Sequence, residues 1–186
     1  MHYKIKVAGI PMSLPVCKLD DSTAIAAFIL LGDVEHAMTL GTELAKRAPS
    51  HDVILTPEAK SITLAHEMSK ALGQERYWVA RKTSKVYLTN PLKVPVHSIT
   101  SPYQQFLYLG QEGVAALKGK RVVLLDDVIS TGETLAALEQ LAERAGATVV
   151  AKMAVFAEGD AVKRSDITCL ASLPIFTKAQ YPEYFE

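Results

Sequence analysis

The residues with the clearest chemical potential lie in one run, VVLLDDVISTGET, which spans residues 122–134. An apolar stretch typical of a strand covered on both faces leads into two adjacent carboxylates, Asp126 and Asp127. A turn containing Ser130 and Gly132 then opens a helix. Backbone N–H groups at a helix N-terminus favour a phosphate dianion, and paired carboxylates accept hydrogen bonds from sugar hydroxyls. The run therefore predicts a site for a sugar phosphate.

The same run also has a purely structural interpretation that requires no ligand. Ser130 and Glu133 fit the S-x-x-E capping box, in which two side chains close the first turn of a helix. A capping box leaves the acid pair, Gly132 and Thr134 unexplained. The run is also distinct from the P-loop and from the dinucleotide-binding fingerprint, because GxxxxGK[ST] and GxGxxG are both absent.

The run resembles the motif with which type I phosphoribosyltransferases bind phosphoribosyl pyrophosphate (PRPP). That motif has four apolar residues, two acids, two apolar residues, a variable residue and T-G-x-T, and residues 122–134 match every defined position. The resemblance implies that Asp126 and Asp127 hold the ribose 2′- and 3′-hydroxyls and are the catalytic carboxylates. The ribose and 5′-phosphate site would comprise Asp126, Asp127, Val128, Ile129, Ser130, Thr131, Gly132, Glu133 and Thr134.

The resemblance extends to the groups around the other substrates. The loop between an expected strand and helix would bind pyrophosphate, often with a cis peptide bond that does not precede proline, and a basic segment would assist it. The expected pyrophosphate residues are Glu58, Ala59, Lys60, Ser61, Arg81, Lys82 and Lys85. The base would lie against Val128 and Phe156. Mg²⁺ would arrive with PRPP and be linked through water to Asp126 and Asp127, without direct protein ligands.

Two departures bear on the choice of base. The segment 97–105, where adenine-type enzymes commonly carry a Glu that handles the purine proton, has none, and His97 is the candidate there. Hypoxanthine–guanine enzymes commonly have an Asp where this chain has Ser130. The expected reaction is transfer of the phosphoribosyl group from PRPP to a purine base, and adenine is the leading candidate for that base. Open alternatives are xanthine or another base, and a PRPP-sensing regulator without catalysis.

Composition limits the classes of partner. Lys plus Arg and Asp plus Glu number 20 each, so the net charge of zero argues against nucleic-acid binding. The longest apolar run, residues 24–31, is too short to cross a membrane. Cys17 and Cys169 have neither metal-ligand nor paired spacing, and the N-terminal residues lack a signal-peptide pattern, so we expect a cytoplasmic protein. The resemblance implies a homodimer.

These residues require elements that hold them at one edge of a sheet. Residues 3–31 are expected to form β structure whose third strand spans 23–31. Further strands are expected over 52–55, 77–80, 121–125 and 148–156, and helices over 33–47, 61–72 and 131–144, the first of them capped by Asp33. Strand, helix and strand over 121–156 make a βαβ unit of a parallel sheet. We expect an α/β fold with a mostly parallel sheet flanked by helices, the type I phosphoribosyltransferase fold. The chain would form one domain, 1–186, with a core over 33–156 and a hood from 1–31 plus 157–176.

Overall fold

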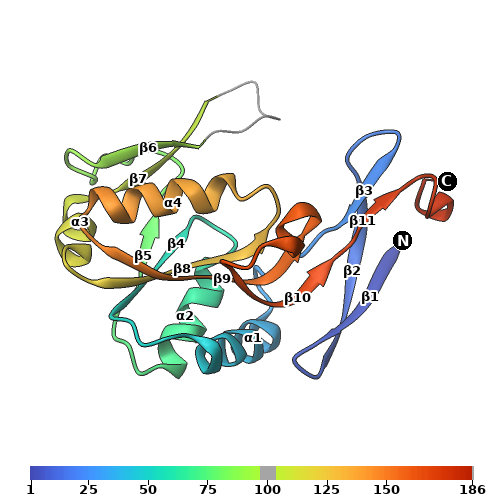
Figure 1. The fold of residues 1–186 in the computed structure, drawn as a ribbon, viewed down its shortest axis with the longest axis horizontal. Helices are drawn as coiled ribbons and strands as arrows, with labels where there is room; N and C mark the ends of the chain where they lie inside the picture. The colour runs from blue at the N-terminus through green and yellow to red at the C-terminus, as the bar shows by residue number, and fades with distance from the viewer. Residues whose placement is uncertain (97–103, 186) are drawn as a thin grey trace.

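The computed structural model describes residues 1–96 and 104–185. Its centre is a parallel sheet whose strands follow the order β10-β9-β8-β4-β5 (Figure 1). The strands are β4 (Val53–Pro57), β5 (Trp78–Ala80), β8 (Arg121–Ile129), β9 (Thr148–Glu158) and β10 (Thr168–Leu173). All of β4 and nearly all of β8 are buried, because both faces of the sheet are covered. The expected α/β architecture is confirmed.

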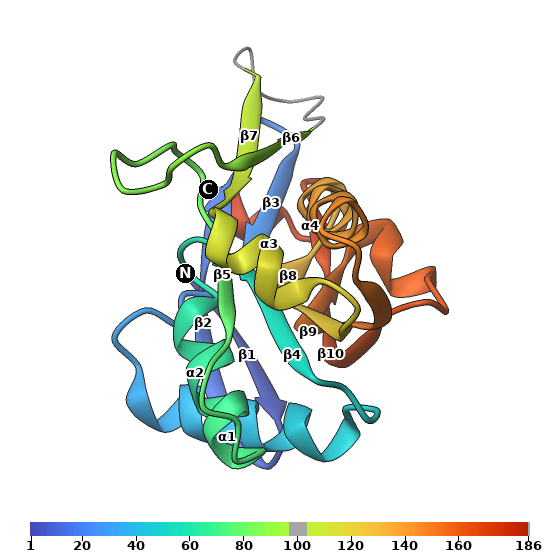
Figure 2. The same ribbon diagram turned by 90° about the vertical axis from the view of Figure 1, so that its left-hand side faces the viewer.

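Helices cover the two faces of the sheet. One face packs against α1 (Val34–Arg47) and α2 (Ile62–Ala71), and the other carries α3 (Gln111–Leu117) and α4 (Glu133–Arg144) (Figure 1). The antiparallel strands β6 (Leu92–Val96) and β7 (Gln105–Leu109) lie beside α4, at the end of the molecule away from α1 and α2 (Figure 2). No helix in the part of the chain that the structure describes is long and apolar enough to span a bilayer.

Local chemistry explains where the helices begin and how closely they pack. The Asp33 side chain accepts a hydrogen bond from the N–H of His36 and so caps α1, as the sequence predicts. Gly41 lets α1 approach α2, because a Cβ added there would lie 2.8 Å from the backbone nitrogen of Met68. The two helices therefore form one tight layer under the sheet.

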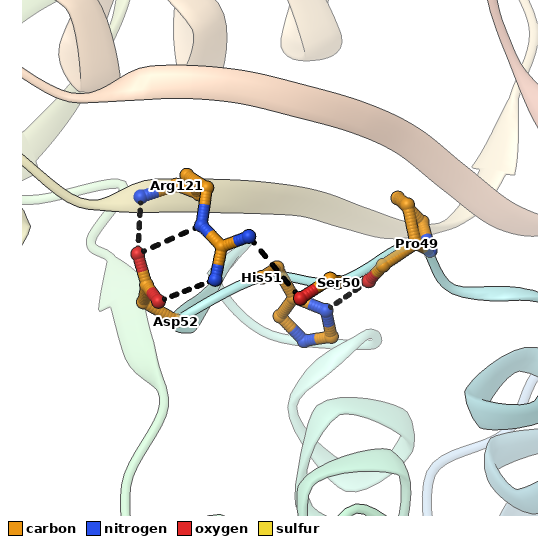
Figure 3. Close-up of polar contacts among 5 residues, drawn as sticks. All are labelled: Pro49, Ser50, His51, Asp52 and Arg121. Atoms are coloured by element: carbon orange, nitrogen blue, oxygen red, sulfur yellow. Dashed lines mark hydrogen bonds and ion pairs between the residues drawn. The ribbon is translucent and has the colours of Figure 1, made fainter.

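An ion pair joins the two central strands at their amino ends, opposite the end that carries the acid pair. The Arg121 guanidinium donates to Asp52 Oδ1 at 2.9 Å and to Oδ2 at 3.3 Å, and also to Ser50 Oγ at 3.1 Å (Figure 3). The hydrogen bonds from Arg121 lower the pKa of Asp52 to about 2. Since Arg121 begins β8 and Asp52 precedes β4, this contact supports the pairing of the two strands.

The hood is an antiparallel sheet of order β1-β2-β3-β11, and it contains both chain ends (Figure 1). Its strands are β1 (His2–Val7), β2 (Ile10–Lys18), β3 (Thr23–Ala26) and β11 (Ile175–Thr177). The fully buried Phe176 ring makes edge contacts with Tyr3, Tyr181 and Tyr184 at centroid distances of 5.4, 5.1 and 4.7 Å. An aromatic cluster thus ties the C-terminal segment, including the short helix η2 (Pro182–Tyr184), to the N-terminal strands.

The expected boundaries differ from the structure at three places. The strand expected up to residue 125 continues to Ile129, and α4 begins at Glu133 rather than at Thr131. The expected third strand ends at Ala26 instead of Leu31. The segment 157–176 divides between the two sheets, because β10 pairs with β9 in the main sheet while β11 joins the hood. Pairing partners far away in sequence decide these limits, and local pattern does not reveal them.

Candidate active site

The strand order places the expected site at one position of the sheet. β4 pairs with β5 on one side and with β8 on the other, all in parallel, so the connections from β4 and β8 leave the sheet at a topological switch point. Ligands of open α/β sheets bind outside the carboxyl ends of the strands at such a point. The loop 58–61 follows β4 there, and the acid pair lies near the end of β8.

The two carboxylates of β8 are buried and differ in their partners. Asp126 and Asp127 are only 7% and 5% exposed. Ser61 Oγ donates to Asp126 Oδ1 at 2.6 Å, and the backbone N–H of Asp127 donates to the same oxygen at 2.9 Å. Burial raises the pKa of Asp126 to about 7, and the charge of Asp127 acts in the same direction. Burial and mutual repulsion thus make it unfavourable for both carboxylates to be charged at once.

Asp127 keeps an oxygen available for a further partner. Its Oδ2 is buried and has no hydrogen bond within the described residues, although Lys60 Nζ lies 3.3 Å away. The distance gives an ion pair, but the geometry is not that of a hydrogen bond. A buried carboxylate oxygen without a donor is unfavourable, so a ligand hydroxyl at this position would stabilise it. This oxygen fits a ribose hydroxyl or a water molecule of a hydrated cation.

The turn after β8 forms a small concave site. A cavity of about 110 Å³ is lined by Asp126 and by residues 128–135. Gly132 precedes α4 with φ of +81°, a conformation that other residues adopt only with strain. The capping-box reading is wrong, because Gly132 caps the helix, and the box would need α4 to begin at Thr131. The N-terminus of α4, which favours an anion, opens at this turn, where the backbone N–H of Glu133 donates to Thr131 Oγ1 at 3.5 Å.

The expected pyrophosphate residues meet at the neighbouring strand ends. Glu58 forms an ion pair with Arg81 Nη2 at 3.1 Å and accepts a hydrogen bond from the backbone N–H of Lys82 at 2.9 Å. The peptide bond between Glu58 and Ala59 is cis, where the family resemblance implies such a bond. Arg81 Nε is buried without an acceptor among the described residues. Lys85 lies farther along the same loop, and within the described residues no hydrogen bond or ion pair joins it to Glu58.

The expected base contacts are only partly brought together. Val128 is half-buried and pairs with Phe156 across β8 and β9. The Phe156 ring is fully buried and lies at an edge contact of 4.9 Å from Phe28, in the core beneath the hood. Its contact with the base stays a prediction. His97 and residues up to 103 lie outside the described residues.

Sequence reasoning missed two residues at this site. Thr56 is fully buried and its hydroxyl donates to the carbonyl of Leu125 at 2.9 Å, which joins the ends of β4 and β8. Glu158 ends β9 and is 7% exposed. The signal that identified Asp126, an acid at the end of an apolar strand, also applies to Glu158. A single acid in that place is too common to stand out.

Comparisons with known proteins agree with this geometry. The family model described as "Phosphoribosyl transferase domain" matches residues 34–181. A hypoxanthine/guanine phosphoribosyltransferase from Methanococcus voltae is 38% identical over 109 residues, which are 59% of this chain and 54% of that protein. An adenine phosphoribosyltransferase from Desulforamulus reducens is 35% identical over 104 residues, 53% of this chain and 54% of that protein. The chain thus spans about half the length of these curated relatives.

Solved structures support the fold. The adenine phosphoribosyltransferase of Thermoanaerobacter pseudethanolicus superposes with a TM-score of 0.65 at 24% identity, over 77% of this chain and 84% of that chain. The adenine phosphoribosyltransferase of Rhodothermus marinus gives a TM-score of 0.63 at 17% identity, over 92% and 93% of the two chains. The second match includes much more of the chain, so the architecture is shared beyond the central sheet.

Proposed function

Since the chain belongs to the phosphoribosyltransferase family, we propose that it transfers the 5-phosphoribosyl group of PRPP to a purine base. The observation that carries this proposal is the buried Oδ2 of Asp127, which pairs with Lys60 but has no hydrogen bond within the described residues, together with the concave turn at the start of α4. A sugar phosphate supplies a hydroxyl for the first and an anion for the second. Adenine is the proposed base, with AMP and pyrophosphate as products.

Each part of the proposed site has a role in the reaction. A base nitrogen attacks the anomeric carbon, the bond from that carbon to the pyrophosphate oxygen breaks, and pyrophosphate leaves with the electron pair. Lys60, Arg81 and Lys82 stabilise the leaving charge, while Asp126 and Asp127 favour the positive charge that develops on the sugar. The turn from 129 to 134 holds the 5′-phosphate and so fixes the sugar for attack.

Mg²⁺ is the proposed cofactor, carried in by PRPP. Within the described residues no three His, Cys, Asp or Glu side chains gather as a direct metal site. The free oxygen of Asp127 has the hard donor character that a hydrated Mg²⁺ prefers. When bound, the cation would neutralise phosphate charge, and Asp126 and Asp127 would hold it through its water molecules.

The choice of adenine rests on Ser130. A carboxylate at this position is common in hypoxanthine–guanine enzymes, and this chain has a hydroxyl instead. The relatives carry both adenine and hypoxanthine/guanine names, so a 6-oxopurine remains the second candidate. We further propose a homodimer in the cytoplasm, which follows from the family resemblance and from the two free cysteines, Cys17 and Cys169.

A panel of bases tests this function. Purified protein is incubated with PRPP, Mg²⁺ and one base at a time: adenine, hypoxanthine, guanine, xanthine, uracil or orotate. Pyrophosphate release is followed, and the nucleotide is identified by mass. We expect adenine to give AMP with the highest kcat/KM. A higher kcat/KM with an oxopurine would correct the base, and PRPP binding without release for any base would support the non-catalytic regulator.

A further inference from the structure

Glu158 is a buried carboxylate that the mechanism above does not use. It is the last residue of β9 and only 7% exposed. A carboxylate is seldom buried unless it has partners, because loss of hydration is unfavourable for the charge. Its position at the carboxyl end of a parallel strand, one strand away from Asp126 and Asp127, is that of a ligand-binding group.

The surroundings of Glu158 leave it only partly compensated. Ser130 lies beside it, one residue beyond the pair of Ile129 and Ala157 across β8 and β9. The Ser130 hydroxyl and the positive charge of Lys60 both act to lower its pKa. No Lys, Arg or His nitrogen within the described residues makes an ion pair with it at 4.0 Å or less. From η1 (Gly159–Lys163), Asp160 and Lys163 pair with each other at 2.8 Å in solvent.

On the other side, β10 pairs Leu173 with Glu158, and leucine carries no charge. Burial therefore raises the pKa of Glu158, and the Ser130 hydroxyl and the Lys60 charge oppose that rise. A carboxylate whose pKa lies above its ordinary value is a better proton acceptor near neutral pH.

The order of the strands tells which substrate meets Glu158. The segments expected to bind pyrophosphate follow β4 and β5, on one side of β8, whereas β9 pairs with the opposite side of β8. In a displacement at the anomeric carbon, the nucleophile enters on the face opposite to the leaving group. With the ribose held by Asp126 and Asp127 on β8, the base enters from the side of β9.

We propose that Glu158 accepts a hydrogen bond from a ring N–H of the incoming base and takes up its proton as the nucleotide forms. This assignment rests on the proposed function. The bond from the base nitrogen to the anomeric carbon forms, and the bond from that carbon to pyrophosphate oxygen breaks. The N–H electron pair stays on the base, the proton passes to the Glu158 carboxylate, and water removes it after product release. Ser130 positions the carboxylate through its hydroxyl.

Glu158→Gln tests the assignment, because it keeps the size of the side chain and removes the proton acceptor. At saturating PRPP and Mg²⁺, kcat with the preferred base falls by about a hundredfold, the low end for loss of a general base. PRPP affinity, measured by calorimetry, stays at the wild-type value. The part of the acidic limb of the pH profile of kcat/KM for the base that comes from Glu158 disappears, and the part that comes from Asp126 remains. Glu139→Gln, which removes a carboxylate of α4 that pairs with Lys152, is the control and keeps the wild-type rate and profile.

Ser130→Ala gives a second readout that does not depend on the folding of Glu158→Gln. The Ser130 hydroxyl lowers the pKa of Glu158, so its loss moves the Glu158 part of the acidic limb to higher pH. An active wild type whose rate and acidic limb are unchanged in folded Glu158→Gln would overturn the assignment and leave the proposed function standing. If Glu158→Gln does not fold, an acidic limb of Ser130→Ala at the same pH as in the wild type would also overturn the assignment. A wild type that turns over no base would overturn both.

Discussion

At the scale of single residues, Asp126 and Asp127 have different chemistry although they are adjacent. Asp126 is satisfied by Ser61 and by a backbone N–H, and burial places its pKa near 7. Asp127 keeps a buried oxygen without a hydrogen bond in the described part of the chain. Asp126 is therefore held by hydrogen bonds within the protein, whereas the Asp127 oxygen has the ion pair with Lys60 and no hydrogen bond.

The pKa of Asp126 predicts how stability depends on pH in the free protein. Because burial raises this pKa from 3.8 to about 7, the stabilisation from Asp126 is fully present below about pH 4 and is lost as pH rises through 7. Asp126→Asn has no such loss. The difference in free energy of unfolding, variant minus wild type, should therefore increase from pH 5 to pH 8 by on the order of 1 kcal/mol or more. One pKa unit corresponds to about 1.4 kcal/mol.

Urea denaturation at pH 5 and pH 8 measures this difference. Asp21→Asn, which changes an exposed carboxylate away from the sheet, is the control and should follow the wild type at both pH values. A parallel pH dependence of Asp126→Asn and wild type would contradict the assigned burial effect.

The backbone conformation at Gly132 favours glycine, because its φ is +81°. An added Cβ would lie 2.6 Å from Arg164 Nη1, but this is the end of a flexible side chain that can move away. Gly132→Ala should therefore lower the free energy of unfolding by about 1–2 kcal/mol and weaken PRPP binding at the turn. Gly146→Ala is the matched control at the other end of α4, with φ of +78° and an ordinary contact of 3.6 Å.

Thermal unfolding and PRPP calorimetry on the two variants separate backbone strain from ligand contact. Gly146→Ala should lose stability and keep PRPP affinity. Equal PRPP affinity in Gly132→Ala and wild type would count against a phosphate site at this turn.

At the scale of elements, the contact between β4 and β8 aligns the two loops of the site. The buried Thr56 hydroxyl donates to Leu125, so Thr56→Val should lower the free energy of unfolding by about 1–2 kcal/mol through loss of a buried hydrogen bond. Thr63→Val is the matched control on α2, since the Thr63 hydroxyl is buried without a partner among the described residues. We expect it to be neutral or stabilising in chemical denaturation. The reverse order of the two variants would contradict this account of the strand ends.

The sequence predicted the elements around the acid pair better than those at the edges. The run 122–134 is specific because its apolar strand, acids and turn together leave few alternatives. The sequence does not predict that β10 and β11 belong to different sheets, because β10 pairs with β9 and β11 pairs with β3, which are both distant in sequence. Glu158 was missed for a related reason. It lies near the acid pair because β9 pairs with β8, and its neighbours in sequence do not indicate this pairing.

At the scale of the whole molecule, the hood closes with strands from both ends of the chain. Phe176 lies at its centre, so Phe176→Ala should lower stability by about 3–5 kcal/mol and loosen the hood. Hydrogen exchange should rise in β1, β3 and β11 and much less in β4 and β8. If the hood contacts the base, KM for the base rises while PRPP affinity is kept. Uniform exchange across both sheets would contradict a separable hood.

On the proposed function, PRPP would bind at the main sheet and the base would bind between that sheet and the hood. Titration of PRPP with Mg²⁺ into the wild-type protein and into Asp127→Asn, followed by calorimetry, is the most direct measurement. We predict saturable binding to the wild type at one site per chain and a loss of affinity of about tenfold or more when the free carboxylate oxygen is replaced. Absence of binding heat in the wild type, or equal affinity in the two proteins, would contradict the account.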